Sequence, residues 1–115
     1  MTTATPTLAA ATYLEARLDG VDIAGIQWFE IAEPGGHPAT KWDYRPNYDA
    51  INDNLDCLST GEAAFLAAMY SFFNPHVGGR MMKRLGVDAP GQLAAILDAP
   101  RLRVIAELMT SYEGW

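Results

Sequence analysis

The clearest hydrophobic pattern lies in the second half of the chain. A helix over residues 60–73 is predicted because four apolar residues recur at i, i+4, i+7 and i+8 and so share one helical face: Phe65, Met69, Phe72 and Phe73. Ser59 and Glu62 precede this stripe with the spacing of a capping box, in which each side chain satisfies a backbone amide at the helix start. The helix therefore has both a start signal and a buried face.

Three further helices are predicted after it. Asn74 and Pro75 favour a new helix start, and that helix should close near Gly86. Its apolar residues are expected to face inward and its cations outward: Val77, Met81 and Leu85 against Arg80, Lys83 and Arg84. Two Asp-Ala-Pro triplets then predict a helix over residues 90–97 and a last one over residues 100–112. The expected buried face of the last helix is Leu102, Ile105, Leu108, Met109 and Tyr112.

The front half is less regular. A helix is predicted over residues 8–19, with Gly20 as its C-cap. A strand is favoured over residues 25–32, although Ile23, Ile26 and Ile31 would also fit one helical face. Turn residues 33–38 come next, and then Thr40, Trp42 and Tyr44 alternate with Lys41, Asp43 and Arg45 as in a second strand. These segments predict a hairpin, which must pack against helices or pair its edge with another chain.

A short helix over residues 49–57 completes the predicted elements. The pattern as a whole indicates an α+β fold that is mostly helical, with an N-terminal helix, a β-hairpin and a compact array of four to five short helices. A length of 115 residues suits one core, and no linker divides the chain, so residues 1–115 are expected to form a single domain.

Charge is distributed unevenly along this chain. Fourteen acidic and eight basic residues give a formal charge of −6. Residues 1–60 hold nine of the acids and three of the bases, so the whole net charge lies in the front half. This balance argues against direct binding to nucleic acid or to anionic membranes, and it favours a basic partner.

The chain shows no sign of export or of membrane insertion. The first residues lack the basic and apolar regions of a signal peptide, and no run of about 18 apolar residues occurs. A single cysteine, Cys57, fits a reducing compartment. We expect a cytoplasmic protein.

Reactive chemistry is weakly represented. His37, His76 and Cys57 have no metal-ligand spacing, and Cys57 beside Leu58 is expected to be a small core residue. No cofactor, metal or catalytic residue is predicted, so we expect a protein that is not an enzyme. One alternative stays open: Gly78-Gly79-Arg80, with the cations after it, could form an anion site of a small enzyme or ligand-binding domain, although close helix packing is the commoner reason for two helical glycines.

The best candidate for function is the segment that spans the second strand and the helix after it. Trp, Tyr and Arg carry much of the energy of protein interfaces, and they are concentrated here. The predicted partner-binding residues are Trp42, Asp43, Tyr44, Arg45, Tyr48, Asp49 and Asp53. In the alternative interpretation, the rings only cover the helical core.

The last 55 or so residues resemble small proteins encoded on bacterial phages, plasmids and integrating elements. The likeness rests on three blocks: TGEAAFLAAMYSFFN over residues 60–74, GGRM over 78–81, and VIAEL with YEGW at the end. Such acidic proteins often inhibit host defence, as anti-CRISPR and antirestriction proteins do.

The resemblance and the charge together lead to one expectation. The chain would be a non-enzymatic, protein-binding inhibitor from a mobile element, occupying a basic, nucleic-acid-binding surface of a host complex. A homo-oligomer that pairs through the hairpin edge is a further alternative.

Overall fold

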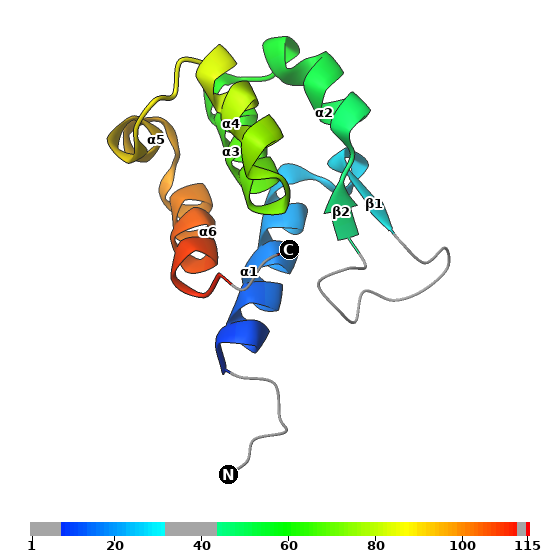
Figure 1. Cartoon of the computed structure of the whole chain (residues 1–115), viewed down its shortest axis with the longest axis vertical. Coiled ribbons are helices and arrows are strands. Elements are labelled where there is room, and N and C mark those ends of the chain that lie inside the picture. The colour runs from blue at the N-terminus through cyan, green and yellow to red at the C-terminus, as the bar shows by residue number, and fades with distance from the viewer. Residues whose placement is uncertain (1–7, 32–43, 113–114) are drawn as a thin grey trace.

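The computed structural model describes residues 8–31, 44–112 and 115. Within them the fold is mostly helical α+β, as predicted, with one two-stranded antiparallel sheet (Figure 1). The elements, in chain order, are α1 (Leu8–Ala24), a 3₁₀ turn (Ile26–Trp28), β1 (Phe29–Ile31), β2 (Tyr44–Pro46), α2 (Tyr48–Asn54), a second 3₁₀ turn (Leu55–Cys57), α3 (Thr60–Phe73), α4 (Pro75–Arg84), α5 (Pro90–Ile96) and α6 (Ala99–Thr110).

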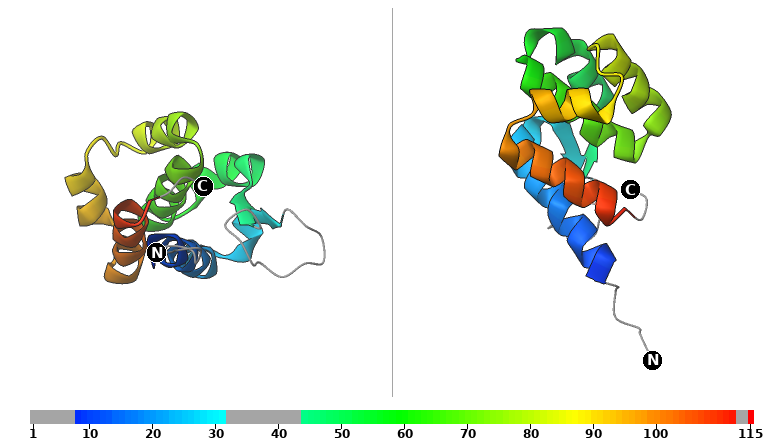
Figure 2. Two further views of the ribbon diagram at one scale, coloured as in Figure 1. Left: turned by 60° about the horizontal axis from the view of Figure 1, so that its bottom comes forward. Right: turned by 90° about the vertical axis from the view of Figure 1, so that its left-hand side faces the viewer.

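Helix α3 is the centre of the core. All eight of its residues from Ala63 to Tyr70 are buried, and α1, α4, α5, α6 and β2 pack around it. Figure 1 shows α2 and the hairpin on one side of α3 and α5 and α6 on the other, while Figure 2 shows α1 and α6 lying side by side. Its alanines, 63, 64, 67 and 68, keep α3 narrow enough for this many neighbours.

The predicted helix starts of the second half are confirmed at three places. The Ser59 hydroxyl accepts from the Glu62 amide, and the Glu62 carboxylate accepts from the Ser59 amide. Asn74 accepts from the amide of Val77 to begin α4, and Asp98 caps α6. Helix α5 also starts at its Asp-Ala-Pro triplet, where the Gln92 side chain reaches back to accept from the amides of Asp88 and Ala89.

Helix α1 is longer than predicted, and Gly20 is not its C-cap. A Cβ on Gly20 would lie 2.6 Å from Met69 Cε and 3.2 Å from Val104 Cγ1, so the glycine lets α1 approach α3 and α6. The helix ends before Gly25, whose φ of +110° suits glycine. Tertiary contact therefore offsets the propensity cost that made Gly20 look like an end.

The hairpin is confirmed with shorter strands than expected. Its register pairs Phe29 with Pro46, Glu30 with Arg45 and Ile31 with Tyr44. The predicted strand over 25–32 is reduced to residues 29–31, because Gly25 and the 3₁₀ turn occupy its beginning. The turn 33–38 and the alternating residues 40–43 lie outside the described part of the chain. The sheet packs on α3 through β2, as an isolated hairpin must.

Three predicted core assignments are wrong. Phe73, the last residue of the predicted stripe, is 37% exposed because it lies at the C-terminal end of α3, beyond the buried middle of the helix. Cys57 is exposed, because the helix gives way to a 3₁₀ turn at Leu55 and the spacing of the apolar stripe no longer holds. In the predicted last helix, Ile105 and Leu108 are buried and Leu102 is partly buried, but Met109 on α6 and Tyr112, beyond its end at Thr110, are 59% and 52% exposed. Helices α1 and α3 cover one face of α6, and the two remaining side chains lie beyond it.

A buried cation joins three distant segments. Arg17, in α1, is 2% exposed, and its Nη2 donates to the carbonyl of Tyr44 in β2. Its guanidinium carbon lies 3.8 Å from the centre of the Trp115 ring, and the Trp115 indole donates to the same carbonyl at 3.1 Å. The N-terminal helix, the hairpin and the end of the described chain thus meet at one polar junction.

The two adjacent glycines of α4 have different surroundings. A Cβ on Gly78 would lie 2.4 Å from Cα and N of Ser71, so Gly78 permits the close crossing of α3 and α4 that the sequence favoured. A Cβ on Gly79 would meet nothing within 4 Å. Packing within the described chain therefore explains only the first glycine.

We expect the two glycines to respond oppositely to alanine. Gly78→Ala should lower the free energy of unfolding by about 1–3 kcal/mol, because the Ser71 backbone must move. Gly79→Ala should raise it by about 0.5–1 kcal/mol, because alanine favours the helix. Urea denaturation measures both, and a Gly78→Ala variant as stable as the wild type would contradict the close crossing.

We also expect the junction at Tyr44 to depend on the planar guanidinium. Arg17→Lys should lower the free energy of unfolding by about 2 kcal/mol, because lysine cannot stack flat on Trp115 while it donates to the carbonyl. Combined with Trp115→Leu, the loss should be smaller than the sum of the single losses by about 1 kcal/mol. Strictly additive losses in urea denaturation would show that the two side chains act separately.

Candidate functional site

Three of the predicted partner-binding residues lie on α2. Tyr48 is 43% exposed, and Asp49 and Asp53 are exposed one helical turn apart. Helix α2 contains no basic residue, and Asn47 caps it by accepting from the amide of Ala50. We call Tyr48, Asp49 and Asp53 the acidic aromatic face.

A ladder of rings holds this face to the core. Tyr48 packs edge-to-face on Tyr70 with centroids 6.1 Å apart, Tyr70 on Phe73 at 5.6 Å, and Phe73 on Trp115 at 5.9 Å. The ladder ends at Trp115, beneath Arg17. Because these contacts fix the ring of Tyr48, little side-chain entropy remains to be lost when a partner binds it.

The carboxylate of Asp49 acts on the same ladder. Burial raises the pKa of Tyr70, and the neighbouring Tyr48 and Asp49 raise this pKa further. The negative charge of Asp49 therefore contributes to the environment of the Tyr70 phenol.

The other predicted interface residues have different surroundings. Tyr44 is partly buried against the core, and its carbonyl accepts from Arg17 and Trp115. Arg45 is exposed but pairs with Glu30 across the hairpin at 3.3 Å. Trp42 and Asp43 lie outside the described residues. The structure thus assembles the α2 part of the predicted surface and ties Tyr44 to the scaffold.

Candidates for reactive chemistry remain scattered. In the described part of the chain, no three His, Cys, Asp or Glu side chains gather as metal ligands. His76 is exposed, with Nε2 3.5 Å from Nη1 of Arg80, and His37 lies outside the described residues. Arg84, one of the cations considered for an anion site, instead binds Asp56 and the side chain and backbone of Asn52.

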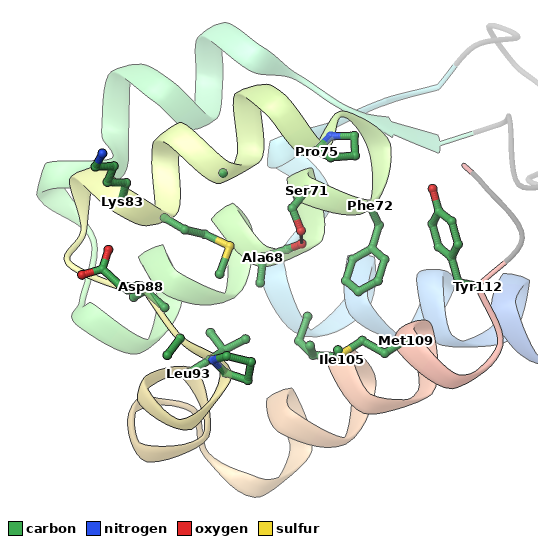
Figure 3. A pocket seen from close by; sticks show the side chains of 15 residues that line it. Ala68, Ser71, Phe72, Pro75, Lys83, Asp88, Leu93, Ile105, Met109 and Tyr112 are labelled. Atoms are coloured by element: carbon green, nitrogen blue, oxygen red, sulfur yellow. Dashed lines mark hydrogen bonds between the residues drawn. The ribbon is translucent and has the colours of Figure 1, made fainter.

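A second surface is a groove that the sequence reasoning missed. It has a volume of about 800 Å³ and opens between α4 on one side and α5 and α6 on the other, with α3 as its floor (Figure 3). Most of its lining is apolar, and we call it the apolar groove. Its residues are Ala68, Ser71, Phe72, Pro75, Gly79, Met82, Lys83, Val87, Asp88, Ala89, Pro90, Leu93, Ile105, Met109 and Tyr112.

Two sequence signals could have revealed the groove. The first is that five apolar residues were assigned to the buried face of the predicted helix 100–112. The neighbouring helices do not cover that many, and Met109 and Tyr112 are left exposed. The second helical glycine, Gly79, likewise had no packing role of its own. Each signal can be interpreted only when the neighbours of the helix are known, because they decide which residues are covered.

Comparison with protein-family models, with curated proteins and with solved structures gave no match to this chain. Among the helices of the described residues, none has the length and apolar character that crossing a membrane requires.

We expect the titration of Tyr70 to report on the acidic aromatic face. Asp49→Asn should lower the pKa of Tyr70 toward the ordinary tyrosine value, since a neighbouring negative charge is removed. Because the pKa of Tyr70 is higher in the folded chain than the ordinary tyrosine value, protonation of Tyr70 adds to the free energy of unfolding. This added stability is fully present below the ordinary tyrosine pKa and is lost as the pH rises through the pKa of the folded chain. NMR of ring-labelled tyrosine measures the shift. Asp88→Asn, on another surface, is the control, and an unchanged Tyr70 pKa in Asp49→Asn would contradict the geometry.

Proposed function

We propose that this chain is a cytoplasmic, non-enzymatic protein-binding module whose acidic aromatic face occupies a basic surface of its partner. One observation carries the proposal: a short helix without a basic residue exposes both Tyr48 and two carboxylates, and the ring of Tyr48 packs on Tyr70 behind it. Tyrosine is enriched among the residues that carry most of the binding energy of protein interfaces.

Arginine is the partner side chain that this face suits best. A guanidinium can stack on the ring of Tyr48 while its N–H groups donate to Asp49 or Asp53. Such a stacked and paired arginine contributes about 1–3 kcal/mol when water is excluded from it. Lysine lacks the planar fork and would gain less.

The charge of the whole front half supports the same partner class. With all of the net charge of −6 in residues 1–60, the chain attracts a basic surface from a distance and speeds association. A basic protein surface of this kind commonly binds nucleic-acid phosphates, so occupying it would block that binding.

The resemblance of the second half to proteins of mobile elements suggests which kind of partner the chain would bind. We propose an inhibitor of the anti-CRISPR or antirestriction type, which competes with nucleic acid for a host defence complex. The acidic surface supports competition by charge mimicry. The resemblance supports the host-defence context.

The first test is capture by the tagged chain from a bacterial host that carries such a defence system. We expect a basic, nucleic-acid-handling protein that is displaced by added DNA or RNA and by salt. The double variant Asp49→Asn/Asp53→Asn and the variant Tyr48→Ala should each reduce its capture at least about tenfold, equivalent to ~1.4 kcal/mol.

A charge-matched control separates the face from the net charge. Glu15 and Asp19 are also exposed and one turn apart, on α1, so Glu15→Gln/Asp19→Asn removes the same charge elsewhere. It should leave capture nearly unchanged. An equal loss in both double variants, or recovery of no basic protein at low salt, would refute the proposal.

A further inference from the structure

The apolar groove lies where one more helix would fit. Helices α4 and α6 each pack on α3 but barely contact each other. The space between them has small residues on its floor, Ala68 and Ser71, and it is open to solvent along its length (Figure 3). Small floor residues let the backbone of an incoming helix approach closely.

Gly79 marks the wall that an occupant would touch. A helical glycine costs about 1 kcal/mol relative to alanine, and the space beside Gly79 holds nothing within 4 Å in the described chain. Its neighbour Gly78 is explained by contact with Ser71, so the two positions differ in what they meet. Close approach of a second molecule would explain why glycine occupies position 79, which contacts within the described residues do not explain.

The groove walls present adaptable and pre-positioned apolar groups. Met82 and Met109 stand on opposite walls, and unbranched methionines fit their shape to a bound helix. The ring of Tyr112 is held in place by Tyr13 and Phe72, at centroid distances of 5.7 Å and 6.0 Å. The exposed side chains are thus organised before anything binds.

Length and charge define the occupant. The wall from Pro75 to Lys83 spans eight residue steps, about 12 Å, which matches two turns of an incoming helix with apolar residues at i, i+4 and i+7. Helix α4 contains no acidic residue, and among the described residues Lys83 forms no ion pair, while Asp88, between α4 and α5, lines the same end of the groove (Figure 3). An acidic side chain on the α4 side of the occupant would complement Lys83 at the end of the groove.

We propose that the apolar groove binds an amphipathic helix of a protein partner, with the apolar stripe of that helix against Gly79 and Met109 and an acidic residue beside Lys83. This site is separate from the acidic aromatic face, and the charged residues of its lining are Lys83 and Asp88. It stands whether or not α2 binds a basic protein.

The test is selection from a displayed library of random peptides about 16 residues long, roughly four helical turns. The wild-type chain is the target and Gly79→Leu is the counter-target, because leucine at this position fills the groove. Enriched sequences should carry apolar residues at helical spacing and at least one acid. Gly79→Leu should weaken the best peptide at least about tenfold, while the fold remains as stable as the wild type.

Two controls complete the design. Gly91 is also helical with open space around it, so Gly91→Leu is the matched variant, and it should leave binding unchanged. Lys83→Glu should weaken acidic peptides several-fold, and replacing the acid of the peptide with lysine should restore binding.

Three results would overturn the proposal. The first is enrichment only of peptides that bind Gly79→Leu as well as they bind the wild type, and the second is enrichment of sequences without helical spacing. The third is a dimer of the chain that Gly79→Leu dissociates in light scattering, because a second copy would then be the occupant.

Discussion

The junction of Arg17, Tyr44 and Trp115 is the contact on which the arrangement of the whole chain depends. Burying a guanidinium is expensive, and here a carbonyl hydrogen bond and a stacked indole help to offset that cost. These partners come from a strand 27 residues along the chain and from a residue 71 positions beyond that strand. No local element can form the junction, so it forms only when the segments dock together. It also fixes Trp115, the inner end of the ring ladder that holds Tyr48.

Close backbone contact is the second organising constraint. Gly20 lets α1 approach Met69 of α3, and Gly78 lets α4 cross Ser71 on the same helix. At both positions a side chain would force neighbouring atoms apart, and the helix-propensity cost of glycine is offset by the packing that it permits. Gly79 has the same propensity cost, yet among the described residues nothing lies within 4 Å of where its Cβ would stand. This contrast between adjacent glycines is one of the grounds on which the groove is proposed to bind a partner.

How much could be predicted from the sequence follows from the range of each interaction. Helix starts depend on side chains within three residues, and the caps at Ser59 and Asn74 are found where the pattern put them. The ends and exposed faces of helices depend on what packs against them, which explains why the true end of α1 and the exposure of Met109 were missed. Arg17 shows the same limit. It occupies the apolar face of its helix, one turn after buried Tyr13, yet its partners are far away in sequence.

The two candidate surfaces share α3 as their support. Tyr70 and Phe73 carry the ladder behind the acidic aromatic face, whereas Ala68, Ser71 and Phe72 lie on the groove side of the same helix. Because Ala63 to Tyr70 of α3 are buried among close-packed neighbours, we do not expect this helix to switch between two arrangements through which one surface could influence the other. Coupling between two sites requires an element with two states that both ligands bias. We therefore expect the two proposed surfaces to bind independently, so that one chain could bring two different partners together without either partner altering the affinity of the other.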